Sequence, residues 1–287
     1  MKNITVDGLT RKYLVHAPSG AREPMPVVFI LHGGGSGAWQ MELYSNFNRV
    51  ADREGFLAVY PSGVDGNWND GRGVEGLRAQ KEKIDDVKFL RMLVDELAKE
   101  NKIDRGRVFA TGISNGGFMS HRLAAEASDV FAGIAPVSGG LAPAIAEKFK
   151  PQYPVSILLI HGEADPIVPF AGGEVGFSGG RKRGKLIPTT EALAKYVARS
   201  GNQGEPTVGT LEPEKDDGTS AVVTKYPDGP GGVKTWYYLV KNGGHTWPGR
   251  PPYLPERIIG KASHAFSASE TIGQFFMSCP ARVLKHP

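Results

Sequence analysis

The pentapeptide Gly112-Ile113-Ser114-Asn115-Gly116 lies between an apolar run over residues 107–111 and a helix-like run over residues 118–125. The apolar run is typical of a buried strand. A G-x-S-x-G motif between a strand and a helix forms a tight turn that lifts a serine hydroxyl out of the sheet. Its glycines leave room where a Cβ would collide with neighbouring backbone. The stretch therefore predicts Ser114 as a nucleophile at the end of a strand.

Apolar strands alternate with amphipathic helices on both sides of this stretch. In the clearest helix, Val87, Leu90, Val94 and Leu97 follow 3-4-3 spacing. Such alternation predicts an α/β fold, with a mainly parallel sheet covered by helices on both faces. The further expected strands cover residues 1–6, 13–15, 27–31, 56–60, 133–137, 155–160 and 234–240, and the expected helices cover 41–53, 84–100, 191–199 (capped by Thr189 or Thr190) and 267–278.

The length and composition indicate one α/β domain over residues 1–287. The chain is 40% hydrophobic and 22% charged, which is ordinary for a folded domain with a sizeable core. No repeat, linker or low-complexity tract divides it. The 38 glycines and 21 prolines fall mostly between the periodic segments, which indicates many tight turns. Residues 203–232 are expected to form a surface excursion or an extra hairpin.

Several classes of protein are disfavoured by the sequence. The single cysteine, Cys279, excludes an intrachain disulfide, and no Cys/His cluster has zinc spacing, so no metal or cofactor is expected. No run approaches the roughly 18 apolar residues that span a membrane. The formal charge of +4 is modest, and the basic run over residues 181–185 predicts a solvated loop. A nucleic-acid patch or a site attracting an acidic polymer is the weaker alternative for this run. The sequence makes no prediction of oligomeric state.

A serine nucleophile needs a base and an orienting carboxylate, and both occur at the ends of later strands. Asp165 follows the strand expected at 155–160 and precedes Pro166, and Glu163 is its near rival. His245 follows the strand expected at 234–240, behind two glycines that let the loop fold back over the sheet. Because ligands collect at the carboxyl ends of strands in open α/β sheets, Ser114, Asp165 and His245 are predicted to act together.

The negative charge of a tetrahedral intermediate needs fixed backbone N–H donors. One donor is expected from Asn115, at the positive end of the helix after the serine. The second is expected from the turn His32-Gly33-Gly34-Gly35, where we favour Gly34 and expect His32 to shape the loop.

Tryptophans near these motifs are candidates for the substrate pocket. Trp68, within the stretch 67–71, would suit an aromatic or sugar-linked substrate, and Trp39 and Trp247 could form further aromatic walls. Core packing is the rival interpretation for each tryptophan. A turn stabilised by Asn and Asp side chains is the equal alternative for residues 67–71.

The motifs together resemble one group of α/β-hydrolase esterases, those related to polyhydroxybutyrate depolymerases and bacterial feruloyl esterases. The resemblance rests on HGGG at 32–35, GNWNDGRG at 66–73, DDV at 85–87, GISNGGFM at 112–119 and GGHTWPG at 243–249. It implies Ser114 as nucleophile, Asp165 as acid and His245 as base.

The resemblance also implies a substrate class. Members of the group act on feruloyl, acetyl or short hydroxyalkanoate esters, so we expect a serine esterase for a small or polymer-linked ester. A feruloyl esterase that releases hydroxycinnamic acids from plant cell walls is the first choice. A polyhydroxyalkanoate depolymerase and an acetylxylan esterase are the alternatives within the group. A peptidase of the same fold and a non-catalytic binding protein on a hydrolase scaffold are rivals from outside it.

The expected location of the protein follows from the same resemblance. Many members of the group are exported, which implies a secreted protein. The residues from Met1 to Val6 contain no apolar secretory core, so a cytoplasmic protein is the alternative.

Overall fold

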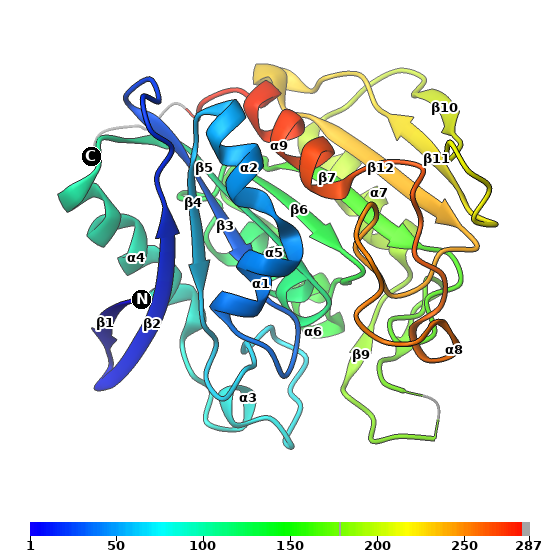
Figure 1. The fold of residues 1–287 in the computed structure, drawn as a ribbon, viewed down its shortest axis with the longest axis horizontal. Coiled ribbons are helices and arrows are strands. Elements are labelled where there is room, and N and C mark those ends of the chain that lie inside the picture. The colour runs from blue at the N-terminus through cyan, green and yellow to red at the C-terminus, as the bar shows by residue number, and fades with distance from the viewer. Residues whose placement is uncertain (178, 283–287) are drawn as a thin grey trace.

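The computed structural model describes residues 1–177 and 179–282 and is built on one large sheet. Its strands run in the order β1-β2-β4-β3-β5-β6-β7-β12-β11-β10 (Figure 1). These strands are β1 (Lys2–Val6), β2 (Leu9–His16), β3 (Met25–Leu31), β4 (Leu57–Pro61), β5 (Ile103–Ile113), β6 (Gly133–Val137), β7 (Ser156–Gly162), β10 (Thr207–Leu211), β11 (Ser220–Lys225) and β12 (Thr235–Lys241). A separate short pair joins β8 (Gly173–Glu174) to β9 (Lys185–Leu186).

The centre of the sheet is parallel and its two edges are antiparallel. Strands β4, β3, β5, β6, β7 and β12 pair in parallel, as the apolar runs in the sequence predict. Strands β1 and β2 extend one edge, and the hairpin β10–β11 extends the other. The alternative that residues 203–232 form a hairpin is therefore confirmed. Because the central strands are parallel, the carboxyl ends of β3, β5, β7 and β12 all lie at the same end of the sheet, across the strand direction.

Helices cover both faces of the sheet. Helices α1, α2 and α9 lie in front of the strands in Figure 1 and bury one apolar cluster, while α4, α5 and α7 pack on a second cluster. The helices are α1 (Ala38–Ser45), α2 (Phe47–Glu54), α3 (Arg78–Lys81), α4 (Asp86–Glu100), α5 (Asn115–Glu126), α6 (Pro143–Glu147), α7 (Thr189–Ser200), α8 (Glu256–Ile259) and α9 (Ala268–Ser278), with a 3₁₀ turn at Pro230–Gly232.

Two local predictions about helices were wrong. Residues 41–53 do not form one helix, because Asn46 adopts a left-handed conformation with φ of 54° and separates α1 from α2. The expected threonine cap of α7 is also absent. Thr189 is the first residue of that helix, and Pro188, which occupies the cap position, offers no side-chain acceptor.

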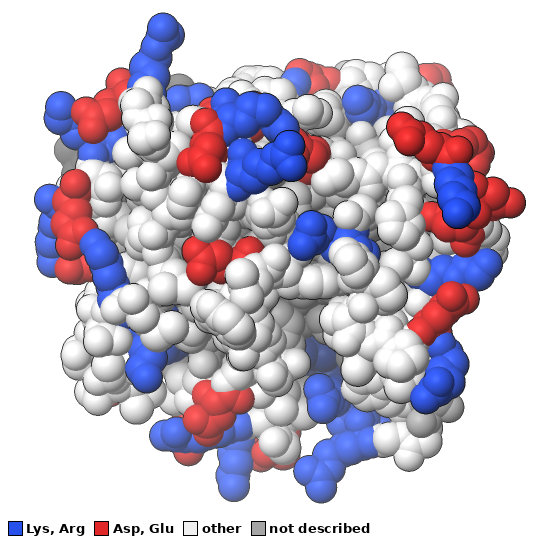
Figure 2. All heavy atoms as spheres, in the orientation of Figure 1, with Lys and Arg blue, Asp and Glu red and all other residues white. Residues whose placement is uncertain are grey.

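The surface carries charges of both signs, and Lys and Arg gather along the lower part of the face in Figure 2. None of the helices within residues 1–177 and 179–282 combines the length and apolar character needed to cross a membrane.

Candidate active site

Ser114 lies on a sharp turn between β5 and α5. Its backbone is strained, with φ of 55° and ψ of −119°, and Asn115 begins the helix immediately afterwards. The turn needs glycine at 112, because a Cβ there would lie 2.5 Å from the carbonyl oxygen of Leu31 on the neighbouring strand. The sequence thus builds a strand-to-helix elbow that presents the Ser114 hydroxyl at the edge of the sheet.

Asp165 and His245 meet at the same edge, after β7 and β12. His245 Nδ1 lies 2.7 Å from Asp165 Oδ2, and both side chains are buried. The other carboxylate oxygen, Oδ1, accepts the backbone N–H groups of Ile167 and Val168 at 2.8 Å each. This carboxylate is therefore fixed by three hydrogen bonds and orients the imidazole ring.

Two opposing effects set the pKa of Asp165. Burial acts to raise it, and the charge and hydrogen bond of His245 act to lower it, with smaller lowering effects from His161 and the Val168 N–H. The lowering effects prevail, so the pKa lies below its ordinary value. Asp165 is consequently a carboxylate over the whole neutral range.

The rival acid and the other histidines have different partners. Glu163 forms an ion pair with Lys241 on the half-exposed side of the loop and does not contact His245. His161 is buried and bonds through Nε2 to the carbonyl of Val168, His121 bonds to the hydroxyl of Tyr196, and His264 pairs with Asp217 at the surface. The structure therefore brings Asp165, and not Glu163, to the imidazole of His245.

Backbone contacts hold the His245 loop close to the serine turn. The N–H of His245 donates to the carbonyl of Ile259 at 2.5 Å. The Ser138 hydroxyl donates to the carbonyl of Thr246 at 3.3 Å, and the neighbouring carbonyl of Val137 accepts the N–H of Ser114 at 3.0 Å. Among the described residues, no hydrogen bond joins Ser114 Oγ to His245 Nε2. In unliganded enzymes such a contact is often long and tightens when the substrate binds.

Two backbone N–H groups near Ser114 are free to bind an anion. In the part of the chain that the structure describes, neither the N–H of Gly34 nor that of Asn115 has a hydrogen-bond partner. The Asn115 side chain is fully engaged, since Oδ1 accepts the N–H of Trp68 at 2.7 Å and Nδ2 donates to Asp70. The N–H of Asn115 also lies at the positive end of α5, which favours negative charge.

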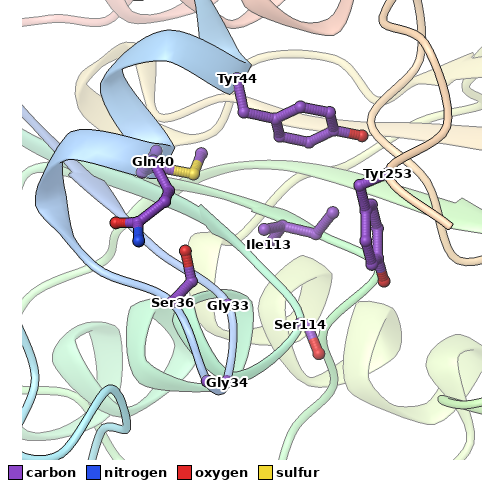
Figure 3. A pocket seen from close by; sticks show the side chains of 10 residues that line it. Gly33, Gly34, Ser36, Gln40, Tyr44, Ile113, Ser114 and Tyr253 are labelled. Carbon is purple, nitrogen blue, oxygen red and sulfur yellow. The ribbon is translucent and has the colours of Figure 1, made fainter.

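A cavity of about 310 Å³ opens beside Ser114 (Figure 3). Tyr44 and Tyr253 form its aromatic walls, with ring centroids 5.9 Å apart and planes at 85°. Neither tyrosine was among the residues predicted from the sequence to line the pocket. The only available signal was their place, Tyr44 in the helix expected after the glycine turn and Tyr253 eight residues beyond His245. The cavity is lined by Gly33, Gly34, Gly35, Ser36, Gln40, Met41, Tyr44, Ile113, Ser114 and Tyr253.

The prediction that Trp68 lines the substrate pocket was wrong. Its side chain is completely buried, its Nε1–H donates to the carbonyl of His32 at 3.0 Å, and its ring packs against the His32 ring. Residues 67–71 follow a turn at residues 65 and 66 and form an irregular segment held by polar side chains, so the alternative is correct as to the side chains. Asp70 pairs with Arg72 and accepts a hydrogen bond from Asn115.

The other two tryptophans of the prediction are not among the residues that line this cavity. Trp247 is fully buried against Phe47, and its Nε1–H donates to the hydroxyl of Ser269 at 3.0 Å, so it anchors the His245 loop to α9. Trp39 is 58% exposed on α1, beside the cavity residue Gln40. Its indole does not line this cavity, and a contact with substrate at its rim stays a prediction.

The arrangement provides the parts that acyl transfer requires. It contains a hydroxyl on a strained turn, an imidazole oriented by a carboxylate, and two free N–H donors beside a cavity. Among residues 1–177 and 179–282, no group of three or more His, Cys, Asp or Glu side chains is placed to hold a metal ion.

Comparison with known sequences gives a consistent family. Residues 15–176 match the family model described as phospholipase/carboxylesterase. NocK of Nocardia uniformis subsp. tsuyamanensis, which is named as an esterase, is 34% identical over 96% of this chain and 82% of its own length. Feruloyl esterase B of Piromyces equi is 28% identical over 82% of this chain, and the chain spans only 42% of that protein.

Comparison with solved structures gives the same fold. An acetyl xylan esterase from Aspergillus awamori aligns with a TM-score of 0.56 at 15% identity. The alignment covers 82% of this chain and 88% of the other. At this identity the likeness establishes the α/β-hydrolase fold, and the substrate of that enzyme does not transfer with it.

Proposed function

The chain belongs to the phospholipase/carboxylesterase family of α/β-hydrolases, and on this premise we propose that Ser114, His245 and Asp165 form its catalytic triad. The protein is a serine carboxylic ester hydrolase. The observation that supports the assignment of residues is the buried Asp165–His245 hydrogen bond of 2.7 Å, at the sheet edge where Ser114 occupies its elbow.

The first half of the proposed reaction forms an acyl-enzyme. Ser114 Oγ attacks the ester carbonyl carbon while His245 Nε2 takes the hydroxyl proton, and Asp165 stabilises the resulting imidazolium. The carbonyl oxygen becomes an oxyanion that the N–H groups of Gly34 and Asn115 bind. As the tetrahedral intermediate collapses, the carbon–oxygen bond to the alcohol breaks, and His245 gives its proton to the departing alkoxide.

The second half releases the acid. A water molecule loses a proton to His245 and attacks the acyl carbon, and the same two N–H groups hold the second oxyanion. The bond to Ser114 Oγ then breaks, and the serine recovers its proton from His245. The triad returns to its starting state with one ester and one water converted into an acid and an alcohol.

We propose that the acid released is aromatic, as in a feruloyl ester. Support comes from the cavity beside Ser114, which has a volume of about 310 Å³ and two tyrosine walls. Aromatic rings favour edge-to-face and offset contacts, which Tyr44 and Tyr253 can offer to a phenolic ring. The similarity to Feruloyl esterase B supports the same substrate class.

Removal of the serine hydroxyl tests the proposed mechanism. Ser114→Ala is expected to lower kcat for 4-nitrophenyl acetate by about 10⁵-fold or more, because no nucleophile is left, while the fold is kept. Circular dichroism and thermal unfolding check the fold. Retained turnover in a folded variant would remove Ser114 from the mechanism.

A substrate comparison tests the aromatic acid. The wild-type protein is expected to hydrolyse methyl ferulate with a higher kcat/KM than methyl butyrate. It is also expected to leave a polyhydroxybutyrate suspension unclarified. A polymer cleared faster than methyl ferulate is consumed would make the depolymerase the correct alternative.

A further inference from the structure

The basic run over residues 181–185 lies at the mouth of the proposed active site. A Cβ built on Gly34, one of the two proposed oxyanion donors, would lie 3.7 Å from Arg183 Nη1. The Arg183 side chain is exposed, and its guanidinium lies 6.0 Å from the ring centroid of Phe177. The solvated loop that the sequence predicts thus carries a cation next to a proposed oxyanion donor.

The backbone of Arg183 is held by hydrogen bonds, although its side chain is exposed. Its N–H donates to the carbonyl of Val175 at 2.7 Å, and its own carbonyl accepts a hydrogen bond of 2.8 Å from Arg72. Arg72 is itself held by the buried carboxylate of Asp70 and lies 4.1 Å from the ring centroid of Phe118. The backbone of Arg183 is therefore held in place through Arg72 and the buried Asp70.

The guanidinium of Arg183 has no carboxylate within ion-pair distance among the described residues. Three acidic side chains of the surrounding segments are already paired, Glu174 with Lys182, Asp70 with Arg72 and Asp65 with Arg78. Arg181, also without an ion-pair partner in the described part, approaches Gly76. In Figure 2, Lys and Arg side chains are frequent in the lower part of the face, among a few Asp and Glu.

We propose that Arg183 binds a carboxylate on the substrate, so that the enzyme prefers esters whose acyl or alcohol portion carries a second, ionised carboxyl group. The inference rests on the proposed function and adds a specificity-determining residue to it. The planar guanidinium matches a carboxylate with two parallel N–H···O bonds. The aromatic cavity takes the uncharged portion of the ester, and the charged portion extends past Gly34 to Arg183.

Two matched ester pairs test this preference. The first pair is 4-acetoxybenzoate and its methyl ester, which differ by a charge on the alcohol portion. The second is 4-nitrophenyl hydrogen adipate and 4-nitrophenyl methyl adipate, which differ by a charge on the acyl portion. In at least one pair, Arg183→Gln should lower kcat/KM for the charged ester about fivefold, the size of one partly exposed ion pair, and change the neutral ester less than twofold.

Lys182→Gln is the matched control, because Lys182 lies in the same run but already pairs with Glu174. In both pairs, Lys182→Gln should leave the ratio of kcat/KM for the charged ester to kcat/KM for the neutral ester within twofold of the wild-type ratio. The proposal is overturned if Arg183→Gln lowers kcat/KM equally for the charged and the neutral esters, or if it changes kcat/KM in neither pair. A second readout does not depend on turnover. In the Ser114→Ala background, the Kd of the preferred charged ester should rise about fivefold on addition of Arg183→Gln.

Failure of the proposed function gives a different result. It would appear as wild-type protein that hydrolyses none of the four esters. Loss of charge preference with intact hydrolysis of the neutral esters contradicts only the role of Arg183.

Discussion

Two loops of this molecule place a glycine-rich stretch beside a buried histidine at the carboxyl end of a parallel strand. His32 follows β3, and His245 comes shortly after β12. Both ring nitrogens of His32 bond to backbone, Nδ1 to the carbonyl of Gly33 at 2.8 Å and Nε2 to the N–H of Gly63 at 2.9 Å. His245 bonds to Asp165 through Nδ1, and its Nε2 has no partner among the residues that the structure describes.

The two rings therefore have different chemical capacities. Burial lowers the pKa of His32 to about 4, against a smaller opposing effect of its bond to Gly33, so its ring is neutral at pH 7. Because Nε2 accepts the Gly63 N–H, the proton lies on Nδ1 and neither nitrogen is available to a substrate. A carboxylate on one nitrogen and an open second nitrogen are what distinguish a proton-transfer histidine from a structural one.

The largest expected effect comes from removing the imidazole of His245, whose Nε2 is the proposed proton acceptor. His245→Asn should lower kcat for 4-nitrophenyl acetate by about 10⁴-fold or more, because Ser114 then has no base. Steady-state kinetics with purified protein measure the loss, and near-UV circular dichroism checks that the fold is kept. A variant with a tenth of wild-type activity would mean that another group takes the proton.

The next effect comes from the carboxylate behind the ring. Asp165→Asn should lower kcat about 10³- to 10⁴-fold, because an amide no longer fixes the Nδ1–H tautomer or stabilises the imidazolium. Glu163→Gln is the control and should stay within twofold of the wild type, since Glu163 pairs with Lys241. Equal losses in both variants would contradict the assignment of Asp165 as the acid.

The fold and the chemical motifs could be read from the sequence because each depends on local pattern. The buried runs of β3, β5, β6 and β7 follow from apolar periodicity, and the order of strand ends follows from parallel pairing. The break at Asn46 could not be read, because a polar residue within a helical pattern does not reveal its φ angle.

The pocket residues were the least predictable part of the site. An aromatic residue near a motif suits a cavity wall and a core position equally, and packing against distant segments decides between them. Trp247 packs on Phe47, some 200 positions away in sequence, and is core. Tyr253 follows the same histidine loop and lines the cavity. The place of Arg183 could not be predicted for the same reason. Residues 181–183 are exposed, as the sequence predicts, but no local pattern shows that their loop lies against Gly34.

His32 should matter for stability more than for chemistry. His32→Asn leaves the Gly63 N–H or the Gly33 carbonyl without its partner, which should lower the free energy of unfolding by about 1–3 kcal/mol. Thermal unfolding should show a Tm lower by roughly 2–8 °C, and kcat at 25 °C should fall no more than about tenfold. A loss of kcat as large as that of His245→Asn would give the two histidines the same role.

The last effect concerns stability alone and is a pH dependence that separates His32 from His245 by protonation. In the unfolded chain His32 titrates near 6.5, and in the fold its pKa is about 4. Between these values the unfolded state binds the extra proton, so the contribution of neutral His32 to stability is complete above pH 6.5 and is lost as the pH falls towards 4. The other buried histidines with a lowered pKa, His121 and His161, are common to the wild type and the His32→Asn variant and cancel in the difference. The difference in free energy of unfolding between the wild type and His32→Asn, measured by urea unfolding, should therefore narrow by up to about 3 kcal/mol from pH 7 to pH 4. A gap that stays constant would mean that His32 binds its proton in the fold as readily as in the unfolded chain, which burial and the Gly63 N–H donated to Nε2 both oppose.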